Sequence, residues 1–334
     1  MARQFQHSLA RREKVPLLVG LVGPSGSGKT YSALELATGI QRVSGGEIFF
    51  VDTEAKRGLH YADRFKFQHV PFGEPFGSLD YLDVLRYCKR AGAGVTIIDS
   101  GSHEHEGKGG LLDLHEQTLQ RMTRGDDSKR SSMQMLAWSE PKQARREFIN
   151  GLLQLEGNYI FCFRAKESSK PVKSPNGKST VEKMGFVPIS GDEFIYEMTA
   201  NILLHPGSNG VPTWQSELLG ERATIKLPEQ FRGFFSEGQR LTREIGEAMA
   251  RWAQGEQPKA PVEPTTNEGL MAEAENMASF GTAALEQWWK LLDKAKKRAL
   301  EAHKEALKAT AKQADSELGD MFGDRFDPAN NPMK

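Results

Sequence analysis

The sequence predicts an α/β fold with a mostly parallel central sheet flanked by helices, followed by a small C-terminal helical module. Over residues 15–206, short apolar runs rich in β-branched residues alternate with helical patterns, which is typical of parallel strands joined by crossover helices. A stretch rich in Pro, Thr and Glu at 255–269 indicates a linker. Beyond it, apolar residues recur at helical spacing over 270–318.

We therefore divide the chain into four parts. Residues 1–254 form one domain, with its core at about 15–206 and an edge hairpin and a closing helix within 207–254. Residues 255–269 are the linker, 270–318 the helical module, and 319–334 a disordered tail.

Composition narrows the class of protein. The 334 residues contain 44 Lys and Arg against 44 Asp and Glu, so any surface for nucleic acid must be local. Cys88 and Cys162 lie far apart in apolar segments, which is typical of a reduced compartment. No apolar run reaches the ~18 residues of a membrane span. We expect a cytoplasmic protein with no membrane partner.

The first element is a buried strand at 15–22 that ends in a glycine-rich turn. The turn fits the pattern glycine, four residues, Gly-Lys-Ser/Thr, through Gly23, Pro24, Ser25, Gly26, Ser27, Gly28, Lys29 and Thr30. Its glycines allow successive N–H groups to point at phosphate oxygens, at the positive end of a helix over 29–40. Lys29 would reach the β- and γ-phosphates, the Thr30 hydroxyl would ligate Mg²⁺, and Tyr31 completes the expected nucleotide contacts. The alternative, a plain strand-to-helix turn, requires Lys and Thr to occur there by chance.

Two further strands bring acids to the same edge of the sheet. The strand 95–98 leads into Asp99, which can hold a Mg²⁺-bound water. The strand 48–51 is followed by Asp52 and Glu54. Glu54 is our candidate for the base that deprotonates a water attacking the γ-phosphate. Asp52 lies nearer the strand, and a role in shaping the turn remains open for it.

The order of these segments resembles that of the RecA-like ATPases. It comprises the phosphate loop, a strand with a trailing "DTE", a strand ending "IIDS", a long helical insertion, the strand "NYIFCFRAKES", a loop and the strand "TANILLHP". More closely, residues 16–206 look like the bacteriophage AAA-type ATP-binding proteins, some of which act in single-strand annealing recombination. The resemblance implies a RecA-like P-loop NTPase core that hydrolyses ATP with Mg²⁺ and binds single-stranded DNA as a homo-oligomer in the bacterial host cytoplasm. It implies that Lys29 and Thr30 bind phosphate and Mg²⁺, that Glu54 is the base, and that Asp99 is the Walker B acid.

One departure from the recombinases concerns the end of the strand 159–163. RecA recombinases carry a glutamine there, whereas this chain has Arg164 and then Lys166. Either cation can stabilise the charge that develops in phosphoryl transfer, in its own subunit or in a neighbour. Two solvated cations at a strand end remain the alternative.

The segment 165–193 stands where RecA-like recombinases keep a second DNA-contacting loop. Its lysines lie among Pro, Gly and Ser residues, at Lys166, Lys170, Lys173, Lys178 and Lys183. We expect a flexible basic strip in which Lys170, Lys173, Lys178 and Lys183 contact DNA phosphates. A mobile loop with ordinary solubilising lysines is the alternative. A second basic stretch, 121–132, is expected to be a flexible surface loop. His103, His105 and His115 do not have the spacing of a zinc signature, so we reject a metal site there.

After residue 206 we expect a hairpin at the sheet edge and a helix that begins near Thr242. The C-terminal module resembles small modules of phage recombination proteins, and its adjacent tryptophans, Trp288 and Trp289, are core residues or a site for a partner or a base. Two functions follow. The first is an ATPase that binds single-stranded DNA and promotes annealing. The second is a nucleotide-gated switch whose C-terminal helices recruit a replication or recombination protein without direct DNA contact. A small-molecule kinase is disfavoured, because no lid with clustered arginines stands out.

Overall fold

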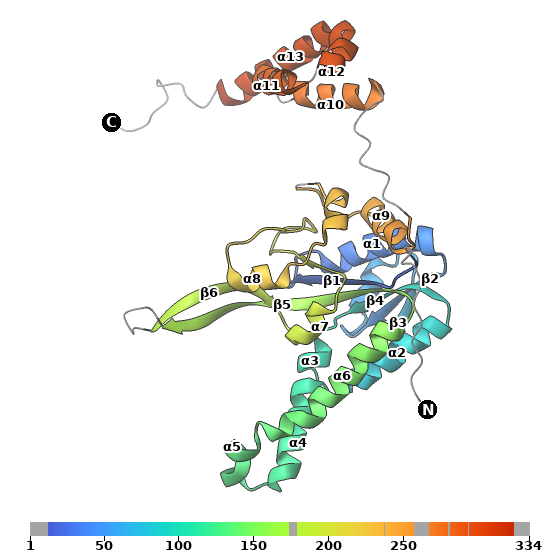
Figure 1. Cartoon of the computed structure of the whole chain (residues 1–334), viewed down its shortest axis with the longest axis vertical. Coiled ribbons are helices and arrows are strands. Elements are labelled where there is room, and N and C mark those ends of the chain that lie inside the picture. Colours follow the sequence, from blue (N-terminus) through green and yellow to red (C-terminus); the bar gives the residue numbers. More distant parts are fainter. Residues whose placement is uncertain are drawn as a thin grey trace, which may run out of the picture. The chain divides into compact units, whose positions relative to one another are not determined.

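The structure is a computed structural model of the chain, and it describes residues 13–173, 179–236, 238–256, 267–279, 281–292 and 294–323. The chain divides into two compact units, Met1–Pro258 and Lys259–Lys334 (Figure 1). The division falls inside the segment 255–269 that the sequence predicts as a linker, of which 257–266 lie outside the described residues.

The first unit is built on a mostly parallel sheet, seven-stranded within the described residues. Six strands follow the order β3-β2-β4-β5-β1-β7, and β6 pairs with β5 alone. Their bounds are β1 Leu17–Gly23, β2 Glu47–Asp52, β3 Gln68–Pro71, β4 Ala93–Asp99, β5 Asn158–Lys173, β6 Ser179–Pro188 and β7 Ala200–Leu203. All pairings other than β5 with β6 are parallel. The predicted α/β fold with a parallel RecA-like core is confirmed.

Helices cover both faces of this sheet, because alternate residues of its strands are apolar on either side. In β1, Leu17, Val19 and Leu21 belong to one core and Leu18 and Val22 to the other. Helices α1 (Lys29–Ser44) and α9 (Arg243–Ala253) pack on the first core. Helices α2 (Ser78–Arg90), α6 (Ser139–Gln154) and α7 (Asp192–Tyr196) pack on the second.

Helix α9 closes the first unit by crossing α1 at two glycines. A Cβ atom on Gly39 would overlap the backbone of Arg243, and one on Gly246 would overlap the backbone of Leu36. Arg243 also donates to Glu35 at 2.8 Å. The close approach of the two backbones therefore depends on the absence of side chains at both positions.

The lysine-rich segment after Arg164 is not the flexible strip that the sequence predicts. Strand β5 continues through it and pairs with β6 in an antiparallel ribbon, from Ala165 opposite Pro188 to Lys173 opposite Ser179. The ribbon projects beyond the sheet (Figure 1). The ladder pairs the backbone groups that the two strands turn toward each other, so this polar sequence forms strands without an apolar core behind it. Lys178 lies outside the described residues.

Two other predicted segments differ. Instead of an edge hairpin, 207–228 contains helix α8 (Leu219–Thr224) and two isolated antiparallel bridges, Asn201 with Lys226 and Leu203 with Thr213. The buried Glu221 holds α8 by accepting from the Phe186 N–H of β6 at 2.9 Å. The predicted surface loop 121–132 is largely helical.

The helical insertion forms an arm of helices α3 to α6 on the first unit (Figure 1). Its helices before α6 are α3 (His103–Glu106), α4 (Leu111–Thr123) and α5 (Arg130–Met133). Arg130 joins α5 to α4 through both carboxylate oxygens of Glu116, each at 2.8 Å. This pair is one contact between α5 and α4 in the segment that the sequence predicts as a loop.

The second unit is a bundle of short helices with a core of its own. They are α10 (Asn267–Ser279), α11 (Thr282–Leu291), α12 (Lys294–Leu300) and α13 (Lys304–Gly323). Helix α13 continues past residue 318, where the predicted tail begins, and 324–334 lie outside the described residues. The core consists of Leu270, Ala274, Ala278, Leu285, Leu300, Leu307 and Ala311. In the part of the chain that the structure describes, no helix is both long and apolar enough to cross a membrane.

Candidate nucleotide site

The glycine-rich turn between β1 and α1 has the backbone geometry of an anion cradle. Gly26 and Gly28 have φ values of +78° and +94°, in the left-handed region that favours glycine. A Cβ on Gly28 would lie 2.7 Å from the Gly210 nitrogen, whose N–H donates to Ser27 O at 3.1 Å. The first N–H groups of α1 have no partners inside the helix, and they stand at its positive end. The loop can therefore present N–H groups to a phosphate.

Lys29 folds over this loop. Its Nζ donates to Gly23 O at 2.7 Å and to Pro24 O at 2.8 Å, and burial lowers the pKa of its ammonium. A cation held by two carbonyl oxygens can exchange them for phosphate oxygens, which are stronger acceptors because they are charged.

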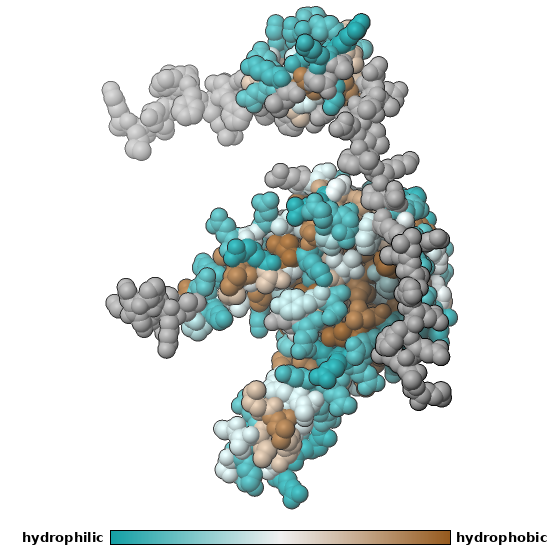
Figure 2. All heavy atoms as spheres, viewed as in Figure 1, coloured by the Kyte–Doolittle hydropathy of each residue, from teal (hydrophilic) through white to brown (hydrophobic). Residues whose placement is uncertain are grey.

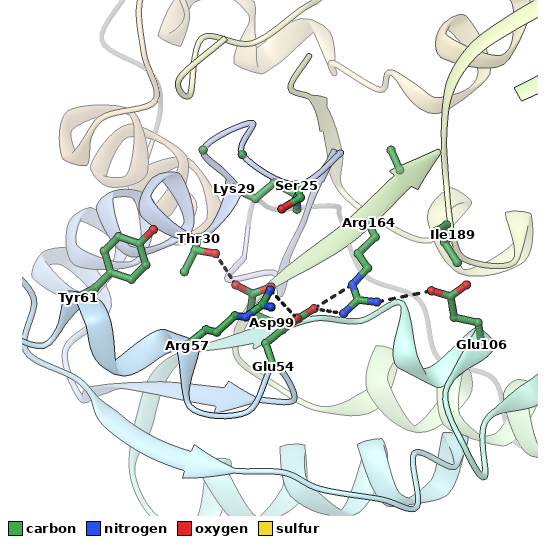
Figure 3. Close-up of a pocket in the computed structure, with 13 residues that line it drawn as sticks. Ser25, Lys29, Thr30, Glu54, Arg57, Tyr61, Asp99, Glu106, Arg164 and Ile189 are labelled. Atoms are coloured by element: carbon green, nitrogen blue, oxygen red, sulfur yellow. Dashed lines mark hydrogen bonds and ion pairs between the residues drawn. The ribbon is translucent and has the colours of Figure 1, made fainter. Parts of the chain in front are cut away.

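Thr30 and Asp99 meet at the carboxyl edge of the sheet, where Thr30 Oγ1 donates to Asp99 Oδ2 at 2.6 Å (Figure 3). Burial raises the pKa of Asp99 to about 6, against the opposing effects of the Thr30 hydrogen bond and the Lys29 charge. A hydroxyl and a carboxylate are the oxygen donors that Mg²⁺ prefers, and a buried carboxylate is stabilised by a cation. The side chains of these two residues therefore fit a Mg²⁺ ion that accompanies a nucleotide.

Glu54, two residues after β2, is held by Arg164 at the same edge of the sheet. Glu54 Oε1 accepts from Arg164 Nε at 2.9 Å and from Nη2 at 2.6 Å. Arg57 Nη1 lies 3.4 Å from Glu54 Oε2, and Arg164 Nη1 lies 3.8 Å from Glu106 Oε1. Figure 3 shows Arg164 between the two carboxylates. Both hydrogen bonds from the arginine therefore go to the same carboxylate oxygen, Glu54 Oε1.

Asp52 shapes the turn that positions Glu54. Its buried carboxylate accepts from the N–H groups of Glu54 at 2.8 Å and Gly58 at 3.0 Å, and contacts His69 Nε2 at 3.0 Å. It does not line the cavity described next. The geometry supports the turn-shaping role that the sequence left open for Asp52.

These side chains surround a cavity of about 430 Å³. Of the residues that the sequence singled out, those that line it are Ser25, Gly26, Gly28, Lys29, Thr30, Glu54, Asp99 and Arg164. Tyr31 instead packs its ring against Phe65, with centroids 5.4 Å apart. Gly23, Pro24 and Ser27 form the loop behind the lining. Lys166 is exposed on the ribbon opposite Val187 and is not in the lining, so only one of the two candidate cations reaches the cavity.

Sequence reasoning gave no role to Arg57, Tyr61, Ala165 and Ile189, which also line the cavity, as Glu106 does. Arg57 and Tyr61 follow "DTE" closely, but their direction depends on the turn that Asp52 fixes. Ile189 reaches the site because its N–H donates to Arg164 O at 2.7 Å. The two residues are 25 positions apart, and no local sequence pattern predicts a contact of that kind.

The histidines that we rejected as metal ligands have other contacts. His103 Nδ1 lies 2.7 Å from Thr53 Oγ1, its ring stacks on Phe76, and burial lowers its pKa. His115 stacks on Trp138 in the arm, with ring centroids 4.1 Å apart. Both therefore pack as aromatic groups.

The lysines of the predicted DNA strip are distributed over the ribbon. Lys166 and Lys170 are four residues apart on β5 and so share one of its faces, while Lys183, opposite Ser169, lies on the other. Lys170 faces Glu182 across the strands. The backbone of Lys173 pairs with Ser179 at the far end of the described ladder. The basic charge is thus divided between two faces rather than gathered on one.

The family model described as an AAA domain matches residues 16–199, more than half of the 334-residue chain. The match includes the phosphate loop, Glu54, Asp99 and Arg164. None of the curated proteins matches the chain. The cradle, the cavity and this match lead to one conclusion: the chain belongs to the AAA-domain family of P-loop ATPases.

Proposed function

We propose that this protein is a phage-type RecA-like ATPase that binds single-stranded DNA and promotes annealing in recombination or replication. The observation that carries the proposal is the course of β5. This one strand runs from the core through Arg164 in the nucleotide cavity and on into the lysine-bearing ribbon. A change at the nucleotide can therefore reach the ribbon along a single hydrogen-bonded element.

Five side chains of the cavity have a role in hydrolysis in this proposal. Lys29 and the loop N–H groups bind the phosphates, and Glu54 accepts the proton of the attacking water. Arg164 stabilises the charge that develops on the γ-phosphate. Thr30 and Asp99 would hold Mg²⁺, which neutralises phosphate charge when it is bound.

The ion pair between Glu54 and Arg164 gives this site a resting arrangement. A γ-phosphate within reach competes with Glu54 for the guanidinium, because both are anions that accept paired N–H bonds. Once Arg164 turns to the phosphate, Glu54 Oε1 is free to accept from water. The same movement shifts the start of the ribbon, which begins at Ala165.

The first test is ATP turnover by the purified protein with and without single-stranded DNA, beside Lys29→Ala and Glu54→Gln. We expect turnover that DNA stimulates and that both substitutions abolish. Glu47→Gln is the matched control, since Glu47 is exposed at the first position of β2, the strand that Glu54 follows. Turnover that survives in Glu54→Gln would reject Glu54 as the base.

The ribbon is tested through the salt dependence of DNA binding. Joint replacement of Lys170, Lys173, Lys178 and Lys183 by alanine should weaken binding and flatten the slope of log K against log salt. The slope should change by about 0.7 for each phosphate that the variant no longer neutralises. The control is a variant in which four lysines of the helical module are replaced by alanine, so that its net charge changes by the same amount. An unchanged slope would remove the ribbon from the DNA-binding site.

A second candidate function is a nucleotide-gated switch that recruits a replication or recombination protein. The neutral overall charge and a C-terminal unit with its own core support it. Turnover indifferent to DNA would favour this function. For either function we propose a homo-oligomer, which light scattering with and without ATP would detect.

A further inference from the structure

The second unit carries a groove between α11 and α13, and the floor of the groove is the edge of the unit's own core. The groove has a volume of about 440 Å³. Three apolar side chains line it, Leu285, Trp289 and Leu307, and lysines from both helices surround them: Lys290, Lys304, Lys308 and Lys312. Thr282 and Glu286 complete the lining. Four ammonium groups thus stand beside an apolar floor with one carboxylate among them.

The two helices that form this groove are fixed to each other at one end. Asp315 of α13 accepts from the Thr282 N–H, at 3.2 and 3.1 Å, and from the Thr282 hydroxyl, at 2.6 Å. These bonds cap the N-terminus of α11 with a carboxylate from α13. The groove is therefore formed before any ligand binds, which lowers the entropy cost of binding.

The lysines of α13 are arranged in a row. Lys304, Lys308 and Lys312 are four residues apart, so they lie on one face of the helix about 6 Å apart along its axis. In an extended peptide, alternate side chains point the same way at a spacing of about 6.6 Å. Acidic residues at every second position of an extended segment therefore match this row.

The lysines are available for a ligand. Lys304 and Lys308 each contact an exposed glutamate three residues earlier, Glu301 at 3.0 Å and Glu305 at 2.9 Å. Such exposed pairs contribute little and exchange readily. Among the residues that the structure describes, Lys290 and Lys312 have no carboxylate within salt-bridge distance.

The contacts of Trp289 favour a peptide over a nucleic acid. Lys304 Nζ lies over its ring, 5.3 Å from the centroid, and so covers a face on which a base would stack. Beneath it lie Leu285 and Leu307, core residues that are 6% and 2% exposed, so the apolar contact that the groove offers is the partly buried Trp289 with these two leucines at its base. The described residues on the face of this unit seen in Figure 2 are mostly hydrophilic.

From this charge and shape we propose that the groove binds an acidic, extended segment of a partner protein. One bulky apolar side chain of that segment rests on the floor formed by Trp289, Leu285 and Leu307. Its carboxylates, on alternate residues, pair with the lysine row and with Lys290. This site shares no lining residue with the nucleotide cavity and so does not depend on the proposed ATPase function, and it names the binding surface of the recruiting function proposed second.

The test uses the full-length protein and a fluorescein-labelled peptide of alternating Asp and Gly residues with a central Phe, followed by fluorescence anisotropy. Binding should weaken at least about tenfold when Phe is replaced by Ala or the Asp residues by Asn, and it should weaken as salt rises from about 0.1 to 0.5 M. The double variant Lys308→Glu/Lys312→Glu should lose at least about tenfold in affinity, and Lys308→Ala/Lys312→Ala should lose less.

The matched control is Lys294→Glu/Arg298→Glu, which makes the same change of charge on α12, at residues outside the groove. It should bind the peptide within about twofold of wild type. ATP turnover should be the same in all these variants. Equal losses in the groove and control variants, or no peptide binding by wild type, would overturn the proposal. The proposal would also be overturned if the protein bound a single-stranded oligonucleotide and not the peptide, and if only the groove variants lost that oligonucleotide binding.

Discussion

Replacing Arg145 should destabilise the first unit strongly, because Arg145 neutralises a carboxylate buried between three helices. Glu104 of α3 and Arg145 of α6 are 1% and 3% exposed, and two guanidinium nitrogens contact the two carboxylate oxygens. Ser78 of α2 donates to the same carboxylate. Arg145→Met leaves Glu104 buried with only the Ser78 hydroxyl, and removal of one partner of a buried pair costs about 3–5 kcal/mol. Two lost charge-assisted hydrogen bonds give a similar sum, at about 1.5–3 kcal/mol each.

The measurement is a urea titration in which hydrogen exchange of peptides from β1 and β5 reports unfolding of the first unit separately from the second. The double variant Glu104→Gln/Arg145→Met should recover at least about 2 kcal/mol relative to Arg145→Met, since no charge is then left unpaired. Arg145→Lys should fall between wild type and Arg145→Met, because an ammonium cannot reproduce the two-pronged contact. A cost below about 1 kcal/mol for Arg145→Met would refute the reasoning.

Three further predictions concern the site and its support. Because the folded-state pKa of Asp99 is raised to about 6, its ionisation destabilises the Mg²⁺-free fold as pH rises from about 4 to 6. Asp99→Asn should thus stabilise that fold against urea by about 2–3 kcal/mol at pH 7.5, and the gain should vanish near pH 4. Gly39→Ala should cost about 1–3 kcal/mol in the same titration by forcing α9 away from α1, and more than Thr38→Ala beside it. Arg164→Ala should reduce kcat for ATP by at least about 100-fold, while Lys166→Ala, outside the cavity, should leave it within about twofold.

Each of these three predictions has a contrary result. A stability gain of Asp99→Asn that is the same at pH 4 and pH 7.5 would contradict the effect of burial on that carboxyl. Unchanged stability in Gly39→Ala would mean that the α1–α9 contact can relax. Equal losses of kcat in Arg164→Ala and Lys166→Ala would show that a place in the cavity lining does not determine which of the two cations acts in catalysis.

The parallel core could be predicted because its signals are local. Runs such as 15–22 and 95–98 are apolar on both faces, and a strand of that kind must lie inside a covered parallel sheet. The acids that follow the strands then fall at one edge by topology alone, which is why Glu54, Asp99 and the phosphate loop could be expected to lie together.

What could not be predicted depends on partners that are distant in sequence. The segment after Arg164 is polar and rich in Pro, Gly and Ser, and its strand conformation comes from pairing with β6, not from an apolar face. Likewise, helix α8 is held by Glu221, which reaches back to Phe186. Glu54 and Arg164 are 110 positions apart in the sequence. The sequence shows that both residues are charged, but it does not show that they pair with each other.

The uninterrupted course of β5 has a thermodynamic consequence. If occupancy of the cavity alters the energy of the ribbon, the coupling free energy is a property of the pair of sites and is the same in both directions. A ribbon ligand that tightens ATP binding tenfold must itself be held ten times more tightly by the ATP-bound protein, a difference of about 1.4 kcal/mol. The effect of ATP on the affinity for the ribbon ligand and the effect of the ribbon ligand on the affinity for ATP, measured in separate titrations, must therefore be equal.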